Sequence, residues 1–380
     1  MRKLLLVALV VLLAACSKDK NVEPPAELVD FKPTINVDRA WSVDMGGGDD
    51  VMRYAMAPAV DGGVAFLAGH DGEVAAVSVA NGDRKWRSDV KMPLSAGPGV
   101  GQGLVVVGSP NGDVIALDAK TGARHWRAEV NGEVLARPAI GGGIVVVHTI
   151  DGRVHGLGVL DGKEAWTFDQ QIPRLSLRGS APPVIAGDSV LCAFDNGKVA
   201  ALSLTDGSML WSSIVSPPHG RTELARLVDI DSAVEVDGQD VYVVGYQGRI
   251  AMLALDSGQI WWARDLSSYR GLAVGTDSLY VSTADSSVVA LSKRDGTEQW
   301  RQEAMLRRSL SGPALDGDVV VVGDYQGYLH WLDAKTGKLL ARSRVDGDRI
   351  TNRPVVASDG TVLVQDDGGE VAAFRIKPRR

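Results

Sequence analysis

The chain has 380 residues, of which 45% are hydrophobic and 23% charged. These values are ordinary for a protein with a packed core, so they exclude global disorder and a polytopic membrane protein. The formal net charge of −7 excludes nucleic-acid binding, which needs a basic surface. The length allows two or three domains of about 100–200 residues, or one large repeat array.

Residues 1–15 have the pattern of a secretory signal peptide. Two basic residues precede the apolar run Leu4–Ala15, which is too short to cross a bilayer because a spanning helix needs about 20 residues. The run ends in LAAC at positions 13–16, which resembles a bacterial lipobox; the alternative is a plain signal peptide followed by a chance cysteine. The resemblance implies that Cys16 is acylated and becomes the N-terminus. Because Ser17 follows, it also implies sorting to the outer membrane.

Residues 16–34 are polar and contain three prolines, which favours an acylated N-terminal tether. The one other cysteine, Cys192, lies in an apolar segment. With Cys16 acylated no intrachain disulfide can form, and we predict that Cys192 is a small buried hydrophobic side chain. Residues 377–380 form a basic tail.

The remainder of the chain is one repeat. Tryptophans recur with a period of about 40–45 residues, which is typical of propeller blades, and they are Trp41, Trp86, Trp126, Trp166, Trp211, Trp262 and Trp300. In each unit from Trp86 onward a small or polar residue followed by glycine precedes this position by four residues, a pair that suits a tight hairpin. Every unit also has a second apolar strand: Val64–Ala68, Leu104–Val107, Ile144–Val147, Val190–Ala193, Val241–Val244, Leu279–Ser282, Val319–Val322 and Val362–Val364.

These units predict an all-β fold, an eight-bladed β-propeller of four-stranded antiparallel blades over residues 35–376. The last unit lacks its fourth strand, so we expect the N-terminal strand around Ile35–Val43 to share a blade with the C-terminal strands and close the ring. The tryptophans are expected to fill the gaps between blades. The seventh unit departs from the pattern because Ala341 takes the tryptophan position.

The repeat resembles the tryptophan-docking repeats of pyrroloquinoline quinone dehydrogenases. Members of that family share a vicinal cysteine pair, which this chain lacks, and Asp229-x-Asp231 departs from an EF-type calcium loop. The six histidines show no metal-ligand spacing, and the sequence contains neither a P-loop nor a nucleophile elbow. We therefore predict a protein that is not an enzyme and has no cofactor or catalytic metal.

Three connections between a tryptophan strand and the next blade are long. They span 41–58, 166–182 and 211–232, against 86–98 and 126–138 elsewhere. The second and third lie on consecutive blades, so they are expected to be neighbours in space. Extra loop length on a rigid ring favours a binding role, although neutral insertion explains the length alone equally well.

The residues within these two loops carry a second resemblance. Leu175, Leu177 and Arg178 combine apolar and basic side chains, and Asp229 and Asp231 supply acids from the next junction. Together with the lipobox, the tether and the eight units, they make the chain similar to the BamB family, the propeller lipoproteins of the outer-membrane β-barrel assembly machinery. The resemblance implies that all five residues bind the POTRA domains of the BamA-type barrel subunit.

The resemblance thus predicts a lipid-anchored scaffold on the periplasmic face of the outer membrane that assists assembly of outer-membrane proteins. Direct binding of their unfolded chains by strand augmentation is a weaker hypothesis, since a closed propeller leaves only short outer edges. Two alternatives are a binding module for another periplasmic or cell-envelope partner and, more remotely, a quinone-dependent oxidoreductase. Asp229 and Asp231 could hold Arg178 in place, pair with a basic residue of the partner, or simply tie two blades together.

Overall fold

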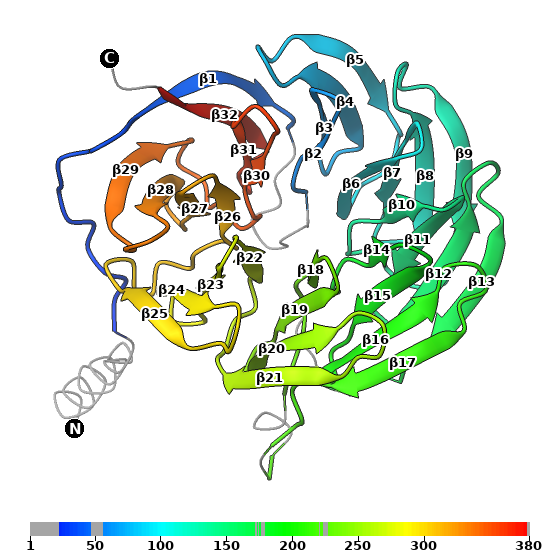
Figure 1. The fold of residues 1–380 in the computed structure, drawn as a ribbon. Helices are drawn as coiled ribbons and strands as arrows, with labels where there is room; N and C mark the ends of the chain where they lie inside the picture. The colour runs from blue at the N-terminus through cyan, green and yellow to red at the C-terminus, as the bar shows by residue number, and fades with distance from the viewer. Residues whose placement is uncertain are drawn as a thin grey trace, which may run out of the picture.

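The computed structural model describes residues 23–46, 56–171, 173, 175, 179–219, 221–222 and 227–377. These residues form eight four-stranded antiparallel sheets arranged as blades around a central axis (Figure 1). The first strand of each blade lies nearest the centre of the ring and the fourth lies at its rim (Figure 1). The predicted fold class and blade number are confirmed.

The strands of blades 1 to 4 are β2 (Ala59–Asp61), β3 (Val64–Ala68), β4 (Glu73–Ser78), β5 (Arg84–Asp89), β6 (Ala96–Gly101), β7 (Leu104–Gly108), β8 (Asp113–Asp118), β9 (Arg124–Glu129), β10 (Ala139–Gly141), β11 (Ile144–His148), β12 (Arg153–Gly158), β13 (Glu164–Asp169), β14 (Val184–Ala186), β15 (Ser189–Ala193), β16 (Lys198–Ser203) and β17 (Met209–Ile214). Those of blades 5 to 8 are β18 (Glu235–Asp237), β19 (Asp240–Val244), β20 (Arg249–Ala254), β21 (Ile260–Asp265), β22 (Leu272–Val274), β23 (Ser278–Ser282), β24 (Val288–Ser292), β25 (Glu298–Gln302), β26 (Ala314–Asp316), β27 (Val319–Gly323), β28 (Tyr328–Asp333), β29 (Leu339–Arg344), β30 (Val355–Val356), β31 (Val362–Gln365), β32 (Glu370–Lys377) and β1 (Asn36–Asp44).

Blade 8 is built from both ends of the chain. β1 pairs antiparallel with β32 from Asn36 opposite Lys377 to Asp44 opposite Glu370, with one irregularity beside Trp41. The predicted closure of the ring by a shared blade is therefore confirmed. Each four-stranded sheet keeps two edge strands, the first at the centre of the ring and the fourth at its rim.

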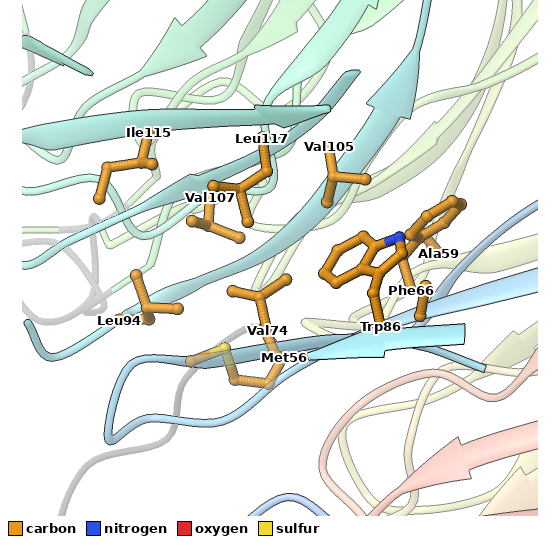
Figure 2. Close-up of a cluster of buried hydrophobic side chains, with 12 residues drawn as sticks. Met56, Ala59, Phe66, Val74, Trp86, Leu94, Val105, Val107, Ile115 and Leu117 are labelled. Carbon is orange, nitrogen blue, oxygen red and sulfur yellow. The ribbon is translucent and has the colours of Figure 1, made fainter. Parts of the chain in front are cut away.

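The core lies between blades rather than within one. Inner strands such as β7, with the sequence LVVVG, are buried on both faces, as runs of β-branched residues favour. Figure 2 shows how Phe66 and Trp86 of blade 1 pack with Val105, Val107 and Leu117 of blade 2. Burying each such side chain contributes about 1.5–3 kcal/mol, so adjacent blades stabilise each other.

Each docking tryptophan packs on the turn glycine of the following blade. At Gly122, whose φ is +71°, an added Cβ would lie 2.5 Å from Cε3 of Trp86, so both backbone conformation and space require glycine there. Trp86 Nε1 also donates to the carbonyl of Ala119 at 2.9 Å. The same packing joins Trp41 to Gly82, Trp126 to Gly162, Trp166 to Gly207, Trp211 to Gly258, Trp262 to Gly296 and Trp300 to Gly337.

The missing tryptophan at Ala341 has a topological cause. In blade 8 the third and fourth strands, β32 and β1, come from opposite ends of the chain, so no hairpin turn joins them and no turn glycine receives a tryptophan from blade 7. Ile35 and Val37 pack into the buried cluster that contains Ala341 and Phe374. The chain entering β1 therefore fills this junction.

Cys192 on β15 is fully buried. Burial raises the pKa of its thiol to about 12, so the thiolate that reacts with oxidants and electrophiles is absent at neutral pH. The prediction of a small buried hydrophobic side chain is confirmed.

Candidate docking surface at the junctions of blades 3 to 5

Two long connections leave the rim strands of consecutive blades and run back to the centre of the ring. One links β13 to β14 and the other links β17 to β18. They meet, since a Cβ added to Gly179 of the first would lie 2.9 Å from Oδ1 of Asp231 in the second. The expectation that these loops are neighbours in space is confirmed.

The candidate residues of the first loop fall partly outside the described part of the chain. Leu175 is described and its side chain is 42% exposed, as expected of an apolar anchor available to a partner. Leu177 and Arg178 lie outside the described residues. Gly179, the next residue in the sequence, is described and approaches Asp231.

The second loop is fixed to blade 5 by its backbone. The amide of Tyr246, in the turn between β19 and β20, donates to the carbonyl of Asp229 at 2.7 Å in an isolated antiparallel bridge. The Asp229 side chain is 1% exposed. Its carboxylate therefore lies beneath the surface rather than on it.

Asp231 occupies an unfavourable environment. Burial raises the pKa of its carboxyl to about 6, and the positive charge of Arg270 opposes that shift. Its Oδ1 is buried and has no hydrogen-bond partner among the residues that the structure describes. Buried polar atoms of this kind are rare in folded proteins, and ionisable groups with perturbed pKa values concentrate at functional sites.

Asp231 also lines a cavity of about 900 Å³ at the centre of the ring, bounded by residues that precede or begin the first strands of several blades. Three arginines and two acids contribute to its wall, namely Arg137, Arg270, Arg353, Asp231 and Glu235. Arg353 pairs with Glu235. Burial and the neighbouring charge of Arg353 lower the pKa of Arg137. The cavity thus carries one more positive than negative side chain, which suits an anionic group.

Sequence reasoning missed these arginines, although a signal was available. Arg137 and Arg353 each precede a proline at the entry to a first strand. The recurring Arg-Pro pair therefore marks equivalent positions that face the axis. Arg270 has no such proline and carries no comparable sign.

A second feature that sequence reasoning missed lies on the rim of the same blades. The residue before each docking tryptophan is charged or polar on β5, β9 and β25, but it is Leu210 on β17 and Trp261 on β21. Their exposed fractions are 56% and 63%, and Met209 and Ile214 of β17 are exposed as well. Apolar groups on outer strands are normally avoided because free edges invite association. The comparison of equivalent positions around the ring is the signal that finds them.

Among the described residues, no group of three His, Cys, Asp or Glu side chains is arranged to hold a metal ion. No helix in the described part of the chain is long and apolar enough to cross a membrane.

The fold and the meeting of the two long loops place the molecule in the class of closed eight-bladed propellers built from tryptophan-docking repeats. A family model described as outer membrane protein assembly factor BamB matches residues 35–90, 70–302 and 284–379. The chain belongs to this family.

Relatives and solved structures agree with the assignment. Outer membrane protein assembly factor BamB of Pseudomonas aeruginosa is 46% identical over 373 residues, covering 98% of this chain and 98% of that protein. The BamB protein of Alkalilimnicola ehrlichii is 44% identical over 375 residues, covering 99% and 97%. The crystal structure of BamB from Moraxella catarrhalis has a TM-score of 0.82 at 26% identity, covering 90% of this chain and 100% of that one.

A quinohemoprotein alcohol dehydrogenase from Comamonas testosteroni has a TM-score of 0.71 at 14% identity, covering 90% of this chain and 77% of that one. At this identity the likeness shows the propeller fold alone, since one fold supports many functions.

Proposed function

We propose that this chain is a non-catalytic assembly factor for outer-membrane proteins that docks on the POTRA domains of a BamA-type barrel subunit. The names of its relatives supply the process. The observation that carries the docking site is the contact between the two long loops at Gly179 and Asp231, the first of which also carries the exposed Leu175. The proposal includes acylation of Cys16, which holds the protein at the periplasmic face of the outer membrane, and assistance to unfolded outer-membrane chains.

The chemistry of the loops suits a protein partner. Leu175 and Leu177 are the apolar anchors, and Arg178 offers a planar guanidinium to a carboxylate or carbonyl of the partner. Asp231 lies next to Gly179, the residue that follows Arg178 in the sequence, and in this proposal it orients the arginine side chain. Asp229, buried and bridged to Tyr246, supports the loop from below.

Co-purification tests the proposal. The tagged, acylated protein is extracted in detergent from its own membranes beside a Leu175→Ala/Leu177→Ala/Arg178→Ala variant. Alanine at buried interface anchors costs about 2 kcal/mol or more each, so we expect the large barrel subunit to be recovered with the parent and lost with the variant. A matched control is Leu160→Ala/Lys163→Ala, which truncates exposed residues in and beside the β12–β13 turn.

Retention of the barrel subunit by the folded triple variant would contradict the site, and its absence from the parent would contradict the partner. The role of Asp231 has its own test. If Asp231 orients Arg178, the losses caused by Asp231→Asn and Arg178→Ala are not additive in a double-mutant cycle, because both remove one interaction. Additive losses would show that Asp231 acts separately.

A further inference from the structure

Residues 23–34, the segment that enters β1, run along the outside of blade 7 between the end of β25 and the start of β1 (Figure 1). They form no helix or strand, yet their backbone is bonded to the ring toward both ends. The amide of Ala26 donates to the carbonyl of Leu306 at 2.9 Å, and the amide of Thr34 donates to that of Leu340 at 2.8 Å. We call residues 23–34 the strap.

Side chains of the ring hold the strap along its length. At its first residue, Glu23 pairs with Arg307 at 2.8 Å. In its middle, Nη2 of Arg342 donates to the carbonyl of Val29 at 3.2 Å, and the same guanidinium lies 5.2 Å from the centroid of the Phe31 ring. The stacked and hydrogen-bonded guanidinium contacts two strap residues at once, which favours a fixed path over a loose chain.

The deepest contact joins the strap to the interior of blade 7. Arg308 is 2% exposed; its Nη1 donates to the carbonyl of Ala26 at 2.9 Å, while its other nitrogens bind the fully buried Asp324 at 2.8 Å. The turn that presents this arginine holds Arg307 at φ +60° and Ser309 at φ +48°. Such a conformation is unfavourable for residues other than glycine and persists only where the surroundings impose it.

We infer that the strap fixes the point at which the lipid anchor leaves the ring, so that the rim at blades 6 and 7 faces the lipid surface. This rests on the acylation of Cys16 in the proposed function. From Cys16 to Glu23 the chain makes seven residue steps, about 25 Å when fully extended. A chain loose up to Thr34 would make eighteen steps and reach about 60 Å.

The short reach determines what the membrane and a partner can touch. The strap leaves the ring at the junction of blades 6 and 7, beside Arg307. The candidate docking loops lie at the junctions of blades 3 with 4 and 4 with 5, three and two blades away around the ring. An anchor fixed at blades 6 and 7 therefore keeps the docking loops away from the lipid and open to a partner.

Two equivalent positions on opposite blades provide the test. Glu303 of blade 6 and Glu129 of blade 2 each follow a docking tryptophan by three residues, and both are exposed. Each is replaced by cysteine in the acylated full chain and labelled with a fluorophore, and the buried Cys192 thiol does not react. The proteins are bound to phosphatidylethanolamine/phosphatidylglycerol vesicles that carry a quencher on their headgroups.

We expect quenching of the residue-303 label to exceed that of the residue-129 label by about two-fold or more, because the anchor holds blade 6 near the lipid and blade 2 far from it. A Phe31→Ser/Arg307→Glu variant should bring the two values together. A matched control is Lys32→Ser, which alters an exposed residue of the same strap. Independently, the amides of Ala26 and Thr34 should exchange their hydrogens about 100-fold more slowly than in an unfolded peptide.

Equal quenching of the two labels in the parent protein would overturn the inference, and so would unprotected amides at Ala26 and Thr34. Failure to bind the vesicles would overturn both the anchor and the inference. The docking proposal can fail independently of this inference, because the Leu175→Ala/Leu177→Ala/Arg178→Ala variant changes no residue of the strap. Loss of the barrel subunit from that variant with an unchanged quenching ratio would support both proposals.

Discussion

Two buried aspartates on different sides of the ring, Asp324 of blade 7 and Asp231 at the junction of blades 4 and 5, differ in how fully they are hydrogen-bonded. Where the strap crosses blade 7, Asp324 is fully buried and accepts hydrogen bonds from Arg308 at 2.8 Å and His330 at 3.0 Å, and these partners lower the pKa of its carboxyl despite burial. At the junction of blades 4 and 5, burial raises the pKa of Asp231, and its Oδ1 has no hydrogen-bond partner within the described residues. A completed network stabilises a fold, whereas an incomplete one sacrifices stability and is typical of a site kept for another molecule.

The largest expected effect comes from breaking the completed network. Arg308→Met keeps most of the side-chain volume but removes the positively charged guanidinium that donates hydrogen bonds to Asp324. Asp324 keeps its hydrogen bond to His330 but loses its charged partner. A buried carboxylate without a compensating charge costs about 3–5 kcal/mol, so we expect the midpoint of urea unfolding to fall markedly at neutral pH. Arg307→Met removes the exposed pair with Glu23 and an exposed hydrogen bond to the carbonyl of Pro24, and it should cost less than about 1 kcal/mol. Equal losses in the two variants would show that burial does not distinguish these pairs.

Removing the charge of Asp231 should raise the free energy of unfolding, whereas removing that of Arg308 lowers it. A carboxyl with a native pKa near 6 and an unfolded value of 3.8 destabilises the native state once it ionises. The contribution of this carboxyl to the free energy of unfolding is therefore fully present below about pH 4. It falls by up to about 3 kcal/mol as the pH rises through 6. Asp231→Asn should be more stable than the parent at pH 8 and close to it at pH 4, as measured by urea unfolding at both values. A variant that is less stable than the parent at pH 8 would contradict the destabilising effect assigned to the ionised Asp231 carboxylate.

The same Asp231→Asn variant should bind the barrel subunit less well, because the amide no longer attracts the guanidinium of Arg178. Gain of stability with loss of binding is the trade-off expected where a site is maintained at the expense of the fold. Unchanged recovery of the subunit together with the gain in stability would leave Asp231 with no part in docking.

The repeat pattern explains why the fold could be predicted almost completely from the sequence. Each docking tryptophan must meet a glycine one blade further on, as Trp86 meets Gly122, so spacing and turn residues together fix both blade and neighbour. The substitution at Ala341 breaks the local pattern for a reason that becomes visible only when both ends of the chain meet in blade 8.

The candidate site was predictable only in part. Loop length and composition indicated the segments that hold Leu175, Leu177 and Arg178 and the Asp229–Asp231 pair, because polar and apolar residues gathered in long connections are local features of the sequence. Their binding role was implied only by the family resemblance. The burial of Asp229 and the burial that raises the pKa of Asp231 depend on what packs around these residues, as does the opposing charge of Arg270. The spacing of residues along the sequence does not reveal such long-range surroundings. For the same reason the path of the strap could not be predicted from the sequence.

The smallest effect on stability is expected at the rim of blades 4 and 5. Leu210→Lys/Trp261→Lys places a positive charge on β17 and on β21. The equivalent position on β5 is Lys85. Both side chains are mostly exposed, so the free energy of unfolding should change by less than about 0.5 kcal/mol. Light scattering should instead show weaker self-association, because lysine on a free edge opposes pairing with another chain.

The matched substitution in the opposite direction is Lys85→Leu on β5, which should increase association without changing stability. If the lysine variant unfolds at lower urea concentration than the parent, Leu210 and Trp261 contribute to the core, and the rim of blades 4 and 5 does not differ from the rest of the ring. If stability is unchanged and scattering falls, the apolar rim of blades 4 and 5 is a surface that the fold does not need. Its apolar character is then a cost in solubility that binding of another chain would offset.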